Sequence, residues 1–121
     1  MNHDLHGKRY IAYARCAAAD GSVSKLEEQI RLIRQFGERL AMQCVDEVRL
    51  AGVSGGTPAL RPDLGRLLAR KQESDDFDVL IMEDFARLTR TGPDGIREIE
   101  TKFERSGVQI VYLIEAMPRE T

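Results

Sequence analysis

The chain has 121 residues, 42% of them hydrophobic, with 18 basic and 20 acidic side chains and a formal net charge of −2. This length suits one domain with an ordinary aliphatic core, and the charge excludes general attraction to nucleic acid, so a contact with DNA needs a local basic patch. Without a membrane-length apolar run or signal-peptide pattern, and with two cysteines that lack metal-ligand spacing, we expect a soluble, cytoplasmic protein with reduced thiols.

Strand-like and helix-like segments alternate along the chain. The predicted strands are residues 9–16, 42–50, 77–82 and 108–114. Such alternation is typical of a parallel sheet covered by helices. We therefore predict a single three-layer α/β domain over residues 9–116, with a mostly parallel sheet of about four strands and flanking helices. Residues 1–8 are expected to be a disordered N-terminus and residues 117–121 a tail.

Helices are predicted between the strands, over residues 24–41, 62–72 and 93–106. In each of them apolar side chains recur every three or four residues, so one face is buried. Ser24 and Glu27 form a capping box at the start of the first helix. Pro62 suits the first turn of the second, and Gly107 can close the third in a left-handed conformation.

Two short motifs follow predicted strands. Tyr13-x-Arg15-x-Ala17 ends the first strand, and Arg87-x-x-Arg90 follows the third. In an open α/β sheet, ligands bind outside the carboxyl ends of the strands. The glycine-rich loop at residues 53–58 follows the second strand at the same edge, so these segments are expected to border one site.

The motifs resemble the active-site signature of the serine site-specific recombinases, the resolvase and invertase family, over residues 9–114. The other matching residues are Gln29, Ser54-Gly55 and Arg61-Pro62. The resemblance implies DNA cleavage and strand exchange through a phosphoserine link, in recombination, inversion or integration, with no cofactor and no metal. By matching position, the DNA-phosphate site would be lined by Arg15, Arg61, Arg87 and Arg90, with Tyr13 nearby. Guanidinium groups suit this chemistry because they are permanently charged, bidentate donors to phosphate oxygens.

The departures from the family pattern concern the reactive positions. The family's nucleophilic serine corresponds to Ala17, and two positions that usually hold Asp are Ala51 and Ala86. These changes favour a catalytically impaired relative that binds the DNA backbone or acts as a regulator, and they leave enzymatic activity open. The alternative is a non-catalytic, flavodoxin-like interaction domain that binds a phosphate-bearing ligand or a partner protein.

A substitute nucleophile near Ala17 is not favoured by the strand register. Period-two alternation places Tyr13, Arg15 and Ala17 on one face. Cys16 then points the other way, into the core, as a free cysteine commonly does. Ser24 lies beyond the strand and is expected to serve as the helix cap.

A metal site is not favoured either. Glu83 and Asp84 could mimic the acidic pocket of a receiver domain, but an early acidic pair is missing, so a charged strand end exposed to solvent is the better explanation. His3 and His6 are expected to be terminal residues rather than ligands, because no third partner is near in sequence.

The resemblance also implies partners. Recombinases of this family continue into a long helix for dimer contacts and then into a DNA-binding module, and nothing after Met117 could supply either. We therefore expect a fragment or a truncated relative, with weak, backbone-directed contact to DNA, a homo-oligomer only in a full-length form, and no membrane partner. The four arginines are expected to converge near the carboxyl ends of the first and third strands.

Overall fold

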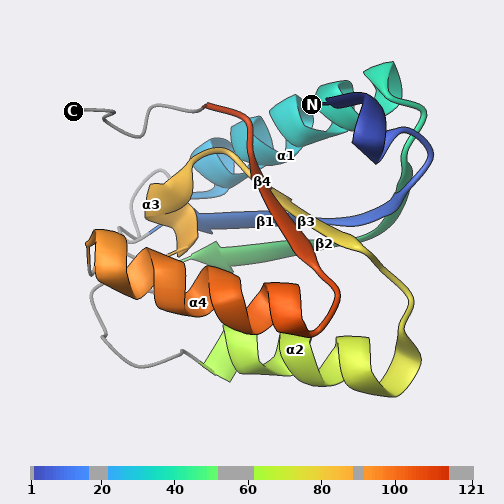
Figure 1. The fold of residues 1–121 in the computed structure, drawn as a ribbon. Helices are drawn as coiled ribbons and strands as arrows, with labels where there is room; N and C mark the ends of the chain where they lie inside the picture. Colours follow the sequence, from blue (N-terminus) through green and yellow to red (C-terminus); the bar gives the residue numbers. More distant parts are fainter. Residues whose placement is uncertain (1, 17–21, 52–61, 89–91, 115–121) are drawn as a thin grey trace.

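A four-stranded parallel sheet forms the centre of the molecule (Figure 1). The computed structural model describes residues 2–16, 22–51, 62–88 and 92–114. The strands are β1 (Arg9–Cys16), β2 (Gln43–Ala51), β3 (Val79–Met82) and β4 (Gln109–Tyr112). Their order in the sheet is β2-β1-β3-β4, and every neighbouring pair is parallel. The predicted α/β domain with a four-stranded sheet is confirmed.

Helices cover both faces of this sheet (Figure 1). They are α1 (Ser22–Arg39), α2 (Pro62–Ser74), the short α3 (Phe85–Leu88) and α4 (Pro93–Arg105), preceded by the 3-10 helix η1 (Asn2–Leu5). Leucine, isoleucine and phenylalanine side chains of α1 form one apolar layer with the sheet. Those of α2 and α4 form the other layer. The three layers arise because each of these helices has one apolar stripe.

The central strand β1 is buried on both faces, and its side chains alternate as the sequence predicts. Ile11 and Tyr13 belong to the layer of α2 and α4, whereas Ala14 and Cys16 belong to the layer of α1. Cys16 is only 5% exposed. The prediction that its thiol points away from the face of Tyr13 is therefore confirmed.

The start of α1 differs from the prediction. The helix begins at Ser22, so Ser24 is its third residue and the predicted capping box is wrong. The carboxylate of Glu27 instead accepts a hydrogen bond from Arg49 Nε of β2, at 2.5 Å. The other helices agree with the prediction more closely, and Gly107 follows α4 with a φ of +91°.

The first residues also differ from the expected disordered terminus. Residues 2–5 form η1, and Leu5 is 2% exposed within the layer of α1. The backbone N–H of Gly7 donates to Leu40 O at 3.1 Å. Burial of Leu5 therefore fixes this segment against the end of α1. The predicted tail and the loop at residues 53–58 lie outside the described residues.

One close contact fixes the distance between α1 and β1. A Cβ added to Gly37 of α1 would lie 2.7 Å from Cε1 of Tyr10. Because Tyr10 is 2% exposed and cannot easily move, only glycine fits here without a shift of the ring.

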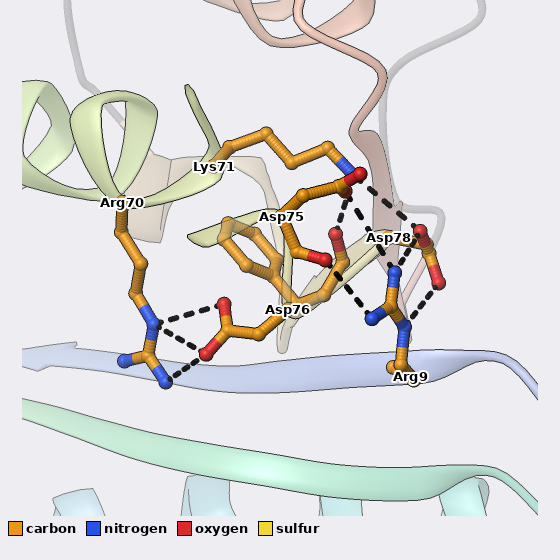
Figure 2. A network of polar contacts seen from close by, with 7 residues as sticks. Arg9, Arg70, Lys71, Asp75, Asp76 and Asp78 are labelled. Carbon is orange, nitrogen blue, oxygen red and sulfur yellow. Dashed lines mark hydrogen bonds and ion pairs between the residues drawn. The ribbon is translucent and has the colours of Figure 1, made fainter. Parts of the chain in front are cut away.

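A cluster of ion pairs ties α2 to the amino ends of β1 and β3 (Figure 2). We call it the lower clamp; its members are Arg9, Arg70, Lys71, Asp75, Asp76 and Asp78. Arg9 Nε and Nη2 each donate to the Asp78 carboxylate at 2.9 Å. Lys71 Nζ donates to Asp75 at 2.5 Å and to Phe77 O at 2.7 Å. The Arg9 guanidinium lowers the pKa of Asp78 to about 2.

Within the part of the chain that the structure describes, no helix is long and apolar enough to cross a membrane.

Candidate functional site

The site lies at the carboxyl end of β1, where the neighbouring strand has stopped. β3 pairs with β1 only as far as Ala12. Three residues later, the backbone N–H of Arg15 donates to Gln29 Oε1 at 3.2 Å, and Arg15 O accepts from Gln29 Nε2 at 3.2 Å. The side-chain amide of α1 thus takes the place of a strand and satisfies both backbone groups.

The side chains of Arg15 and Arg87 each donate a hydrogen bond to the backbone carbonyl of the other residue. Arg15 Nε donates to Arg87 O at 2.7 Å, and Arg87 Nη1 donates to Arg15 O at 3.2 Å. Arg15 is 1% exposed, and Arg87 is part of α3. Two arginines that are 72 residues apart in the sequence therefore share one site, because β1 and β3 are neighbours in a parallel sheet.

Carboxylates balance the charge of Arg87. Its Nη2 donates to Glu83 Oε1 at 3.2 Å, and its Nε lies 3.6 Å from Asp84 Oδ1. The latter distance exceeds that of a hydrogen bond. The side chains of Glu83 and Asp84 are only 19% and 25% exposed. The predicted solvent-exposed strand end is therefore wrong, because both carboxylates face the guanidinium.

A pocket of about 440 Å³ opens beside these residues. It is lined by Ser24, Lys25, Glu28, Gln29, Glu83 and Arg87. Ser24 contributes to this pocket from the first turn of α1, and Glu83 directly follows β3. Positive and negative side chains meet here around a space large enough for a phosphate group. Among the described residues, no cluster of histidine, cysteine and acidic side chains could hold a metal ion.

A buried acid that the sequence analysis missed lies on the same face. Tyr13 Oη donates to Asp63 Oδ2 at 2.6 Å, and the two residues are 0% and 9% exposed. Asp63 is the second residue of α2, a position where the negative charge of an acid interacts favourably with the helix dipole. The alternation in β1 directs Tyr13 toward the layer of α2, so the sequence pattern indicates that a polar partner of its hydroxyl lies on that side.

The structure describes half of the predicted site residues. It places Tyr13, Arg15 and Arg87 at the carboxyl end of the sheet. Ala17, Arg61 and Arg90 lie outside the described residues. Of the four arginines that we expected to converge, the structure shows Arg15 and Arg87 in contact.

The chain matches one protein family over most of its length. The family model for the resolvase N-terminal domain matches residues 10–121. No curated protein matches the chain.

Three of the solved structures with a similar fold match most of this chain. The C-terminal catalytic domain of ISC1926 TnpA, an IS607-like serine recombinase, is 26% identical with a TM-score of 0.75; the match covers 92% of this chain and 71% of that one. The N-terminal catalytic domain of TP901-1 integrase is 24% identical with a TM-score of 0.69, covering 88% and 77%. A resolvase family site-specific recombinase from Streptococcus pneumoniae is 18% identical with a TM-score of 0.73, covering 93% and 78%. The last two likenesses concern the fold alone.

Proposed function

Because this chain belongs to the resolvase N-terminal domain family, we propose that it is a recombinase-type domain that binds DNA backbone phosphate and has lost the cleavage chemistry. The observation that carries this proposal is the mutual contact of Arg15 and Arg87 at the carboxyl end of the sheet. Matching position adds Arg61 and Arg90 to the proposed phosphate site, with Tyr13 beside it.

The chemistry of phosphoryl transfer explains why arginines define such a site. Negative charge on the phosphate oxygens is stabilised best by fixed, permanently charged donors. Arg87, which lines the pocket, is held by Arg15 O and by Glu83, so its orientation is set before a ligand binds. Preorganised donors of this kind can bind the DNA backbone even where no bond is cut.

The proposed loss of cleavage follows from the residue at the nucleophile position. Ala17 has no hydroxyl that could attack phosphorus. Cys16 is buried in the layer of α1, so a thiol cannot take over from the face of Arg15. Ala51 and Ala86 lack the carboxylates that relatives carry. Removing one member of a catalytic set removes most of its effect.

The proposed partner is DNA, contacted weakly and without sequence readout. We further propose that the protein acts in the cytoplasm and that self-association would need a longer form of the chain. A domain that binds DNA without cutting it would regulate DNA recombination rather than perform it.

The test compares retention of DNA on a filter with retention of mononucleotides. We expect DNA to be retained at low salt and lost steeply as salt rises, with about 0.9 in log–log slope for each phosphate neutralised. Arg87→Ala should remove most retention, and Arg87→Lys should restore part of it, because lysine keeps the charge but not the bidentate fork.

Arg97→Ala is the matched control, since Arg97 is exposed on α4 and carries the same charge. Equal losses in Arg87→Ala and Arg97→Ala would contradict a local phosphate site. Retention of mononucleotides in preference to DNA would support the alternative, a domain that binds a small phosphate-bearing ligand. Urea unfolding of each variant separates loss of binding from loss of fold.

A further inference from the structure

Among the described residues that line the pocket beside Arg87, positive and negative side chains are equal in number. Lys25 and Arg87 contribute positive charge, and Glu28 and Glu83 contribute negative charge. A site made only of cations would attract every phosphate group, and more strongly the more charge the group carries. Because this pocket also contains carboxylates, its affinity for a phosphate group should not simply increase with the negative charge of that group.

Glu83 is the carboxylate that acts directly on the phosphate-binding group. It accepts a hydrogen bond from Arg87 Nη2 at 3.2 Å and is 19% exposed. A guanidinium has five N–H donors, and two of those of Arg87 are bound to Arg15 O and Glu83. A phosphate that binds the terminal nitrogens of Arg87 must consequently approach the Glu83 carboxylate closely.

Two further carboxylates of the described residues lie near this site, and they are placed differently. Glu28 is 53% exposed, and Arg31 neutralises it at 2.6 Å. Asp84 Oδ1 lies 3.6 Å from the buried Nε of Arg87, whereas Glu83 accepts a hydrogen bond from a terminal nitrogen. Glu83 is therefore the carboxylate with the largest effect on an anion in the pocket.

Phosphate groups differ in charge according to how they are esterified. An internal phosphodiester carries one negative charge, whereas a phosphate monoester carries about −1.5 to −2 near neutral pH. The additional charge of the monoester would lie close to Glu83 and be repelled. A single charge can be accommodated by sharing Arg87.

We infer that Glu83 determines specificity at this pocket, so that it accepts singly charged phosphodiesters and rejects doubly charged phosphate monoesters. The inference rests on the proposed function and deepens it, because it names the charge class of the ligand. It implies that the domain binds within a DNA strand and not at a 5′-phosphorylated end.

The test uses two small probes, dimethyl phosphate and methyl phosphate, at about pH 8, where the monoester is a dianion because its second pKa is about 6. Affinities are measured by NMR titration of the backbone amides of Gln29, Glu83 and Arg87. The unmodified chain should bind dimethyl phosphate more tightly. In Glu83→Gln the ratio of affinities should move toward methyl phosphate by about three- to tenfold, as expected for removal of one nearby like charge.

Glu98→Gln is the control, because Glu98 is exposed on α4 and its loss changes the net charge equally. An unchanged ratio in Glu83→Gln, the same shift in Glu98→Gln, preference of the unmodified chain for methyl phosphate, or binding of neither probe would each overturn the inference. The amide spectrum of each variant verifies its fold. DNA retention decides the proposed function separately, because neither probe contains a nucleoside.

Discussion

The lower clamp should make the free energy of unfolding depend on the ionisation of Asp78. A pKa lowered from 3.8 to about 2 corresponds to at most about 2.4 kcal/mol. The Asp78 side chain is 33% exposed, so solvent screening reduces the contribution to about 1 kcal/mol. Because the folded pKa is the lower one, this stabilisation is present above about pH 4 and is lost as the pH falls through about 2.

Urea unfolding of the parent chain and Asp78→Asn at several pH values measures this contribution. At pH 7 the variant should be less stable by about 1 kcal/mol. The difference should shrink below about pH 4, where Asp78 of the unfolded parent chain becomes protonated, and should be lost near pH 2, where folded Asp78 is protonated too. Glu73→Gln, an exposed carboxylate of the same helix, should show no such change. A difference that stays constant down to pH 2, or that is absent at pH 7, would refute the reasoning.

The remaining predictions concern α1, the buried tyrosine and catalysis. Gly37→Ala should destabilise the fold by about 1–2 kcal/mol in urea unfolding, because overlap with the Tyr10 ring outweighs the higher helix propensity of alanine; a more stable variant would show that the ring can move. Tyr13→Phe should cost about 1–2 kcal/mol by removing the buried hydrogen bond to Asp63, and unchanged stability would contradict this. The chain should form no covalent adduct with DNA on a denaturing gel, and Ala17→Ser alone should restore little activity; an adduct with the unmodified chain would disprove the proposed loss of cleavage.

The sequence predicts best those elements in which the spacing of apolar residues reflects burial against a neighbouring layer. Alternation in β1 correctly separates Tyr13 from Cys16, because the strand is packed on both faces. The capping-box pattern, which uses only neighbouring residues, predicted the start of α1 incorrectly. Ser24 and Glu27 have the pattern of a capping box, but the helix begins earlier and Glu27 binds Arg49 of β2.

The candidate site could be predicted only in outline. Motif order places Arg15 and Arg87 at the same edge of the sheet, and they are in contact. The orientation of their side chains depends on partners from other elements, such as Gln29 of α1. The contact between Tyr13 and Asp63 joins residues 50 positions apart; alternation in β1 indicates the side on which a partner lies but not which residue it is.

The hydrogen bond from the Arg15 amide to Gln29 makes this amide a reporter of how the site assembles. Its proton is held by a side chain of α1, whereas residues earlier in β1 pair with β3. In native-state hydrogen exchange, opening at Arg15 requires only that α1 moves away from the end of the strand, without separation of the sheet. The rate at this single amide, compared with that of Ile11, therefore measures how often the arginines lose their fixed orientation while the rest of the protein stays folded.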